Sequence, residues 1–372
     1  MTSCPGTSTA SVEPIPLFLP LLRDRLDPVA ELGALRAARP VARLDVPDDM
    51  PAVWLVTGYE EVRRVLGDSE TFSNDLARLA GTGLENLAAQ DPGGLGFTDP
   101  PDHTRLRRLL TPEFTAHRLH ALRPRIDAVV GSTIDVLEVQ GPPADFVTDF
   151  AVPIPSLVIC DLLGVPEEDR AGLERRGAER FDVLGSMEDS LTAVRASLDY
   201  LTELVTRYRT DPQPGLLATL LRRHGDDLAD RELAELADGL LIGGHETTAS
   251  MLALGALTLL EKPLLADGLR SGDIPVGPFV EELLRVLSVV QVAFPRFARQ
   301  ATELGTERVG AGDVVLCSLT AANRDPAFVD QTDHGNATRQ PAPHLAFGHG
   351  IHRCIGAELG RMELRAALPT LL

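Results

Sequence analysis

Cysteine is scarce in this sequence of 372 residues, and the few that are present are scattered. The four are Cys4, Cys160, Cys317 and Cys354, and no two of them form a C-x-x-C pair. This spacing argues against a disulfide framework and against a zinc site built from thiolates. A reducing compartment suits such a chain, so we expect a cytoplasmic protein.

Positive charge and long apolar runs are also scarce. The chain has 35 Lys and Arg residues against 54 Asp and Glu residues, a formal net charge of -19. A field of that sign repels phosphate backbones and anionic lipids, so we expect no nucleic-acid partner and no membrane surface. No run of about eighteen uncharged apolar residues occurs, which argues against a membrane span. No basic residue precedes Arg23 in a proline-rich segment, which argues against a signal peptide.

The composition is otherwise that of a globular protein, with 44% hydrophobic and 24% charged residues. Residues 1–27 are rich in proline, and we expect them to form a lead-in. Residues 28–372 show no flexible linker and no internal repeat, which predicts one domain. A short helix is expected over 28–38, followed by a hairpin with strands over 41–44 and 53–56.

The middle of the chain has mainly helical periodicity. Its longest run begins at Asp230, a favoured N-cap residue, and continues to Pro263, which is long enough to cross a whole domain. Short β-like runs follow over 292–298 and 314–316, and a last helix is expected from Gly356. The sequence therefore predicts a mainly α fold with a smaller β region, whose parts come from both ends of the chain.

The most specific motif is FGHGIHRCIGAELGR, which contains Cys354 among three glycines. Glycine permits a backbone that approaches a flat ligand closely. Cys354 also lies just before a helix start, where free N–H groups favour a thiolate over a thiol. Two other interpretations are a buried cysteine with a packing role and a zinc site that includes His344, His349 and His352.

This segment resembles the haem-binding loop of the cytochromes P450, with Gly360 in place of the family's usual alanine. The resemblance implies that heme b is the cofactor and that Cys354 is the thiolate ligand of its iron. It implies a P450 domain over 28–372, with haem between the long helix and the Cys354 loop. It also implies contacts with haem, including one propionate, by Phe347, Gly348, Gly356 and His352.

A second motif, GGHETTAS, lies in the middle of the long helix. Two adjacent glycines there cost about 2 kcal/mol relative to alanines, so a close neighbour or a function is expected. The Thr247 hydroxyl is placed to bond the Gly243 carbonyl, although a simple helix crossing would account for the same residues. The motif resembles the family's oxygen-activation helix. That resemblance implies a proton relay by Thr247 and Glu246, with Gly244 beside the cofactor and Gly243 at the substrate.

A third motif, EELLR, places Glu282 and Arg285 three residues apart on a helix. By itself it indicates an exposed surface pair. In this order along the chain it resembles the structural E-x-x-R pair of the family, which lies under the cysteine loop. The pair's usual third partner precedes that loop, and His334 with Gly335 occupies the corresponding place.

Several further positions depend on the same resemblance. His103 and Arg107 lie four residues apart on one helix face, which by itself indicates a basic surface helix. In the family, such residues pair with haem propionates, and Arg296 occupies a similar place. The substrate pocket is expected from the segments 76–96, 172–190 and 289–294. The residues assigned to it here are Val292, Ala293, Phe294 and Gly243.

The resemblance implies a monooxygenase that inserts one atom of molecular oxygen into a lipophilic small molecule, such as a secondary-metabolite intermediate. Electrons are then expected from a separate ferredoxin and ferredoxin reductase, and a monomer is expected. The basic patch that would bind an acidic ferredoxin consists of Arg107, Arg108, Arg118 and Arg353. Two alternatives are a peroxide-driven or non-oxygenating haem enzyme, which couples or rearranges its substrate, and a catalytically impaired haem-binding protein.

The C-terminal end departs from the family pattern. The sequence stops at Leu372 within the expected last helix, and the family's C-terminal β hairpin is expected to be missing. We expect the side chains of Leu371 and Leu372 to lie uncovered, with the chain truncated or the substrate pocket open.

Overall fold

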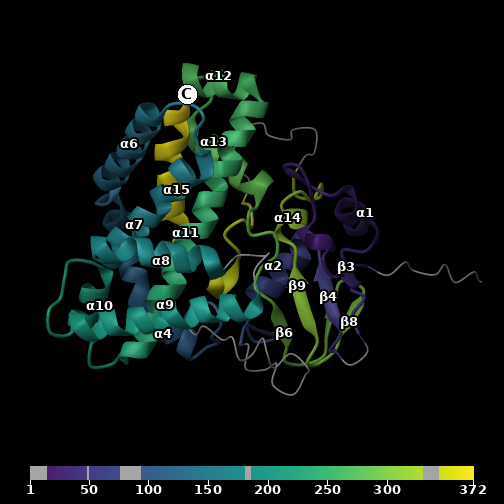
Figure 1. Cartoon of the computed structure of the whole chain (residues 1–372). Helices are drawn as coiled ribbons and strands as arrows, with labels where there is room; N and C mark the ends of the chain where they lie inside the picture. Colours follow the sequence, from purple (N-terminus) through teal and green to yellow (C-terminus); the bar gives the residue numbers. More distant parts are fainter. Residues whose placement is uncertain (1–14, 48–49, 76–93, 181–185, 330–342) are drawn as a thin grey trace, which may run out of the picture.

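The computed structural model describes residues 15–47, 50–75, 94–180, 186–329 and 343–372. A large helical region and a smaller β region lie side by side (Figure 1). This division agrees with the mainly α fold predicted from the sequence.

The helical region is built around α11 (Asp230–Glu261), which packs against helices from both halves of the chain. The helix begins one residue after Ala229, so the expected N-cap role of Asp230 is wrong. Asp230 instead accepts hydrogen bonds from Thr206 and Arg209. The other main helices here are α4 (Asp102–Leu110), α5 (Ala116–His120), α6 (Arg123–Gln140), α7 (Pro153–Leu163), α8 (Glu167–Arg180), α9 (Met187–Tyr208), α10 (Leu216–His224), α12 (Pro263–Ser271), α13 (Val276–Leu287) and α15 (Ala357–Ala367).

The β region joins the two ends of the sequence in one sheet. Its strand order is β3-β4-β9-β6-β5, and the central pair, β4 and β9, is parallel with Val53 opposite Val314. The bounds are β3 (Val41–Arg43), β4 (Val53–Val56), β5 (Phe72–Ser73), β6 (Arg296–Ala298) and β9 (Val314–Cys317). Helices α1 (Ala30–Ala38), α2 (Tyr59–Gly67) and α14 (Leu319–Ala322) and the small hairpin of β7 (Thr302–Leu304) with β8 (Glu307–Val309) complete this region.

The predicted hairpin over 41–56 is confirmed, whereas the run over 292–298 is mostly not a strand. Within that run only Arg296–Ala298 forms one, and Val292 makes a single bridge to Ser318. The two prolines at the hairpin turn flank residues 48–49, which lie outside the described part.

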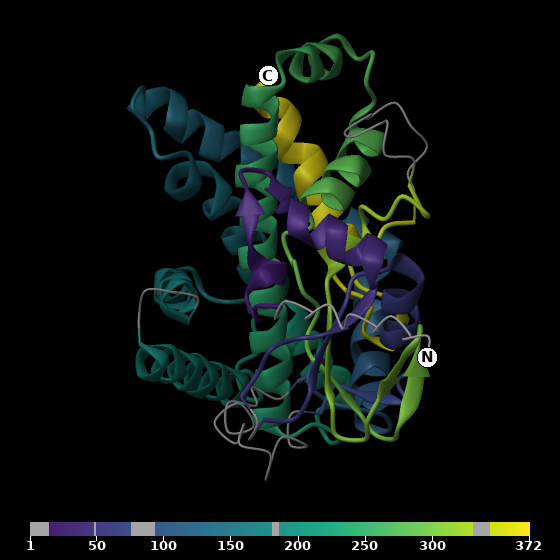
Figure 2. The same cartoon turned by 90° about the vertical axis from the view of Figure 1, so that its right-hand side faces the viewer.

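Residues 15–27 pack against the rest of the molecule, so the body begins earlier than the predicted boundary at residue 28. Ile15 and Leu19 are buried in the core under the sheet. The Arg23 guanidinium donates to the Gln291 side chain at 2.9 Å and to the Leu287 carbonyl. Figure 2 shows this segment lying along the face of the molecule.

The last helix ends earlier than expected, at Ala367, and a 3-10 turn over Leu368–Leu371 follows it. Leu368 is buried, and Leu371 and Leu372 pack against the helical core. The expectation that these last leucines lie uncovered is therefore wrong, because the turn folds them back onto the core.

Membrane-spanning character was tested on the part of the chain that the structure describes. There, no single helix is both long and apolar enough to cross a bilayer. Only α11 and α12 taken together meet those two criteria, and they are separated by a bend of 102°.

Candidate active site

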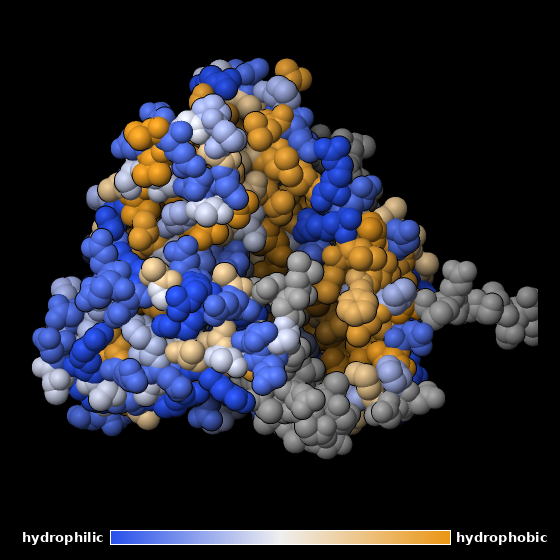
Figure 3. All heavy atoms as spheres, in the orientation of Figure 1, coloured by the Kyte–Doolittle hydropathy of each residue, from blue (hydrophilic) through white to orange (hydrophobic). Residues whose placement is uncertain are grey.

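A cavity of ≈ 270 Å³ lies between α11 and the Cys354 loop. Most of the side chains around it are apolar, including Met251, Leu284, Val289, Val290 and Leu319. Cys354 lines it from the loop and Thr247 from the helix, so the two motifs found in the sequence share one cavity. Figure 3 shows apolar side chains gathered where the helical and β regions meet.

The Cys354 loop is shaped by two glycines in left-handed backbone conformations. Gly348 has a φ of 70° and Gly350 a φ of 72°. A Cβ at Gly350 would collide with the Leu66 carbonyl at the end of α2, so only glycine fits there. The Cys354 N–H donates to the Phe347 carbonyl at 2.9 Å, which closes the loop and leaves the thiol open to the cavity.

The Cys354 thiol is subject to opposing electrostatic effects. Burial raises the pKa of the Cys354 thiol, although the residue as a whole is exposed. The Gly356 N–H and the charges of Arg107 and Arg353 lower that pKa, but by less. Burial and the neighbouring N–H group and charges therefore act on this thiol in opposite directions, and the expectation that the loop favours a thiolate stays a prediction. A bound metal ion would supply the missing stabilisation, because metals bind the deprotonated sulfur.

The two glycines of α11 serve different purposes. Gly243 lines the cavity, and no described atom lies within 4 Å of the place a Cβ would take there. A Cβ on Gly244 would lie 3.1 Å from Ile159 of α7, so this glycine allows two helices to pack closely. Gly244 is not among the residues that line the cavity, and its expected place beside the cofactor stays a prediction. The Thr247 hydroxyl donates to the Gly243 carbonyl at 2.7 Å, as the sequence predicted.

Glu246 lies beside the cavity wall rather than in it. It is half-buried, and burial raises the pKa of its carboxyl group. The Nδ1 atom of the buried His245 lies 3.7 Å from the Glu246 carboxylate. Thr248, which the sequence analysis overlooked, is buried and lines the cavity next to Thr247. Its spacing of three residues from Met251, which also lines the cavity, is the signal that would have indicated this face.

Basic side chains gather at one end of the cavity. Arg296 and His352 line it, and both are mostly buried. The His103 ring lies 4.2 Å from the His352 ring, measured between centroids. Within the described residues, neither ring nitrogen of His103 nor Nε2 of His352 has a hydrogen-bond partner. Such orphaned buried nitrogens are the signature of a site for an acidic group.

The electrostatics of these imidazoles follow from their burial. Burial, together with the nearby His103 and Arg296, lowers the pKa of His352 to about 3. Burial and the charge of Arg107 likewise lower the pKa of His103. An incoming carboxylate would reverse this effect, since it favours the protonated imidazole.

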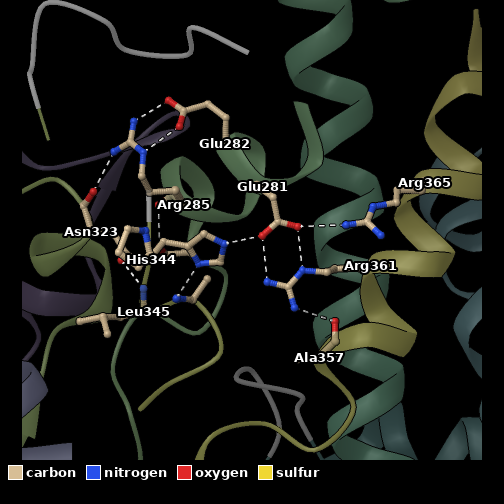
Figure 4. Close-up of polar contacts among 12 residues, drawn as sticks. Glu281, Glu282, Arg285, Asn323, His344, Leu345, Ala357, Arg361 and Arg365 are labelled. Atoms are coloured by element: carbon tan, nitrogen blue, oxygen red, sulfur yellow. Dashed lines mark hydrogen bonds and ion pairs between the residues drawn. The ribbon is translucent and has the colours of Figure 1, made fainter. Parts of the chain in front are cut away.

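The Glu282 and Arg285 pair is buried, so its interpretation as an exposed surface pair is wrong. Arg285 is 2% exposed and donates to the Glu282 carboxylate at 2.8 and 2.5 Å. Its remaining Nη1 donates to the Asn323 carbonyl at 2.7 Å (Figure 4). His334 and Gly335, the expected location of a third partner, lie outside the described residues.

The neighbouring glutamate, Glu281, is a functional candidate that the sequence analysis missed. Its carboxylate accepts two hydrogen bonds from Arg361 of α15, at 2.7 and 2.8 Å. It also contacts His344 at 3.2 Å and Arg365 at 3.3 Å. No local spacing links Glu281 to Arg361, so no sequence pattern would have revealed the contact.

The zinc alternative named His344, His349 and His352 beside Cys354. His344 faces Glu281 instead of the cavity, while His349 and His352 do line the cavity. Across the ranges that the structure describes, no group of three or more potential ligand side chains is placed to hold a metal ion.

Only some of the residues expected to contact substrate line the cavity. Ala293 and Phe294 line it, and the Phe294 ring is 54% exposed and lies 4.6 Å from the Phe97 ring. Val292 is not among the residues that line the cavity. Its backbone forms an isolated β-bridge with Ser318. Of the expected pocket segment 76–96, residues 76–93 lie outside the described part, as do 181–185 of the segment 172–190.

Comparison with known proteins agrees with this geometry. The family model described as Cytochrome P450 matches residues 277–372. "Cytochrome P450 FAS1" of Rhodococcoides fascians is 42% identical over 362 residues, covering 96% of this chain and 90% of the relative. "Nocardicin C N-oxygenase" of Nocardia uniformis subsp. tsuyamanensis is 40% identical over 357 residues, covering 93% and 89%.

Solved structures give the same result. OxyE, a cytochrome P450 involved in teicoplanin biosynthesis, superposes with a TM-score of 0.85 at 40% identity, covering 96% of this chain and 91% of that one. OxyC, implicated in oxidative C–C coupling during vancomycin biosynthesis, gives 0.83 at 38% identity, covering 94% and 87%. The chain therefore belongs to the cytochrome P450 family. It is a P450 monooxygenase, an enzyme whose cofactor is haem held through a cysteine thiolate.

The described residues fit that cofactor. The cavity has one thiol facing it, two glycines in conformations that allow close approach, and a basic end with orphaned imidazole nitrogens. A flat ligand with an iron centre and two carboxylates requires these three features.

Proposed function

We propose that this P450 inserts one atom of molecular oxygen into a lipophilic small molecule, an intermediate of secondary metabolism. The observation that carries the proposal is that Cys354 and Thr247 line the same apolar cavity. Nocardicin C N-oxygenase and the glycopeptide-antibiotic P450 OxyE are relatives whose names place them in such pathways. An apolar lining with few polar groups suits a substrate bound mainly by burial of its surface.

In this proposal the chain holds haem from two directions. Cys354 supplies the thiolate to iron, while His103, Arg107, Arg296 and His352 receive the propionates. Arg296 suits this role because its planar guanidinium donates paired hydrogen bonds to a carboxylate. Bound haem supplies the activation of dioxygen, and the protein supplies the thiolate, the dry cavity and the protons.

Protons reach the cavity through the acid and the alcohol of α11. The raised pKa of the Glu246 carboxyl group keeps a larger share of it protonated near neutral pH, which suits a proton donor. The Thr247 hydroxyl rests on the Gly243 carbonyl at 2.7 Å and lies at the cavity wall. A hydroxyl in this place both donates and accepts, so it can pass a proton from the acid into the cavity.

Electrons come from a ferredoxin, itself reduced by a ferredoxin reductase. Arg108, Arg118 and Arg353 are exposed, and Arg107, which precedes Arg108 in the sequence, is partly exposed. A local basic surface allows an otherwise acidic protein to bind an acidic carrier. The charge reversal Arg353→Glu should raise the KM for ferredoxin and leave kcat nearly unchanged, and the effect should shrink in high salt.

The test of the proposed function is a substrate search by spectral titration, followed by turnover under ¹⁸O₂. Lipophilic metabolites that shift the haem spectrum are incubated with ferredoxin, its reductase and reduced cofactor. One ¹⁸O atom in the product supports oxygen insertion. A product without added oxygen contradicts it.

Oxidative coupling is a second candidate, favoured by the likeness to OxyC. In that case two aromatic groups of the substrate become joined, and the product loses hydrogen without gaining oxygen. The mass of the product in the same experiment separates the two candidates.

A further inference from the structure

The two consecutive glutamates of α13 face different partners (Figure 4). Glu282 bonds Arg285 on its own helix. Glu281 reaches α15, where its two oxygens take the Nε and Nη2 donors of Arg361 at 2.7 and 2.8 Å. A paired arrangement of this kind fixes the plane of a guanidinium as well as its position.

The orientation of Arg361 matters because its guanidinium group lies over the Phe347 ring. Its guanidinium carbon is 4.5 Å from the centre of the Phe347 ring. Phe347 lines the cavity, and its carbonyl accepts the N–H of Cys354 at 2.9 Å. Three successive contacts therefore connect the Glu281 carboxylate with the residue that carries the thiol.

We propose that Glu281 is a positioning residue that holds Arg361 flat on Phe347 and thereby sets how strongly the Cys354 sulfur donates electrons to haem iron. The inference rests on haem ligation by Cys354 but not on any particular substrate. The guanidinium charge lies close enough to influence the sulfur, and the Glu281 carboxylate offsets that charge. Without the carboxylate, a positive group near the sulfur would draw electron density away from it.

The carboxylate is a constant charge in this arrangement and does not act as a switch. Burial by itself raises the pKa of Glu281, but hydrogen bonds from His344 and Arg361 outweigh burial and hold the pKa at about 2. His344 and Arg365 also contact this carboxylate, so both of its oxygens accept more than one hydrogen bond. Glu281 therefore stays ionised over the working range of the enzyme.

The experiment compares haem-loaded Glu281→Gln with the wild type. Glutamine keeps the size of the side chain and one acceptor oxygen but removes the charge. We expect the midpoint potential of the iron to rise, because less negative charge favours reduction, and the Soret band of the reduced carbon monoxide complex to shift. The matched control is Glu358→Gln, since Glu358 also bonds Arg365, at 3.3 Å, but does not contact Arg361 or Phe347 in any described bond. Glu358 influences the Arg361 charge without bonding it, so this control should shift both quantities by much less than Glu281→Gln.

Two further variants separate charge from folding. Glu281→Asp keeps the charge and should return the potential toward the wild-type value. An unchanged potential and Soret band in Glu281→Gln, or an equal shift in Glu281→Asp, would overturn the proposal. If Glu281→Gln fails to take up haem, Arg361→Lys decides, because it keeps the charge but loses the planar group over Phe347. A wild-type spectrum and potential in that variant would also overturn the proposal. Haem ligation is tested separately with Cys354→Ser.

Discussion

The Cys354 side and the α11 side of the cavity are held in different ways. On the Cys354 side, backbone hydrogen bonds within one short loop combine with buried ion pairs from α13. On the α11 side, a single helix contributes Gly243 and Thr247, and the rest of the wall comes from separate segments such as 289–294. The first side fixes a thiol in one place, whereas the second leaves apolar surface that can differ in shape.

This difference indicates which changes the enzyme tolerates. A change on the Cys354 side disturbs the cofactor and, through buried charges, the fold. Under the proposed function, a change on the α11 side should alter proton delivery or substrate binding while the cofactor stays bound. The following predictions test this division.

The largest effect is expected for Cys354→Ser. A serine hydroxyl cannot supply the thiolate, so the thiolate-specific Soret band of the reduced carbon monoxide complex should disappear. The control is Cys317→Ala, because Cys317 is buried in β9 and does not line the cavity. A thiolate spectrum that persists in Cys354→Ser would show that the ligand had been misassigned.

Arg285→Ala should cost about 3–5 kcal/mol of folding free energy, because it removes a buried guanidinium that donates to the Glu282 carboxylate and to the Asn323 carbonyl. The control, Arg270→Ala, breaks an exposed pair of the same i, i+3 spacing with Asp267. That change should cost no more than about 1 kcal/mol. Urea unfolding of both variants measures the difference, and equal costs would contradict the division between buried and surface pairs.

Glu281 should make the free energy of unfolding depend on pH in the acidic range. Its pKa lies at about 2 in the folded protein against 4.5 ordinarily, because hydrogen bonds from His344 and Arg361 outweigh burial, which acts in the opposite direction. A lowered carboxyl pKa stabilises the fold above pH 4.5, and this stabilisation is lost as the pH falls from there toward 2. The contribution at neutral pH is up to roughly 3 kcal/mol. Unfolding free energies measured from pH 3 to 7 should show a shallower slope in Glu281→Gln.

Thr247→Ala should leave haem and substrate binding intact but divert reducing equivalents to peroxide, with a several-fold fall in product per reduced cofactor consumed. The missing hydroxyl interrupts proton delivery while little volume is lost. The control is Thr258→Ala in the same helix, where the hydroxyl donates to the Leu254 carbonyl at 2.8 Å away from the cavity. Equal coupling in both variants would assign Thr247 a packing role only.

The smallest effect distinguishes two neighbours on the substrate side. Phe294→Ala should weaken substrate binding by roughly tenfold, because an aromatic ring buried against a ligand contributes about 1.5 kcal/mol. Val292→Ala should have little effect, since Val292 does not line the cavity. Spectral titration measures both, and a larger loss in Val292→Ala would reverse the assignment.

The parts of the site that the sequence predicted are those with local causes. The Cys354 loop and the Thr247 contact with Gly243 depend on residues a few positions apart, so their pattern is visible in the chain. The contact between Glu281 and Arg361 joins residues 80 positions apart. The packing of Gly244 on Ile159 likewise depends on how two helices cross. Neither leaves a periodic signal.

The same distinction applies to the fold. The hairpin over 41–56 follows from two short β-rich runs on either side of a proline-containing turn, and the long helix follows from its periodicity. The pairing of β4 with β9 does not follow from the sequence, because apolar strands such as these could pair equally well with other strands. The strand expected over 292–298 is too long for a related reason, since its apolar residues resemble a strand while only Arg296–Ala298 forms one and Val292 makes a single bridge.

The parallel pairing of Val53 with Val314 also has a consequence for the order of folding during synthesis. The β4 strand, VWLV, is synthesised long before its neighbour β9. The edge of β4 that pairs with β9 therefore stays unpaired while about 260 further residues are added. The same delay applies to Leu66, which meets Gly350 from the other end of the chain. Pairing across such a separation forms slowly, so haem should be captured as one of the last events of folding.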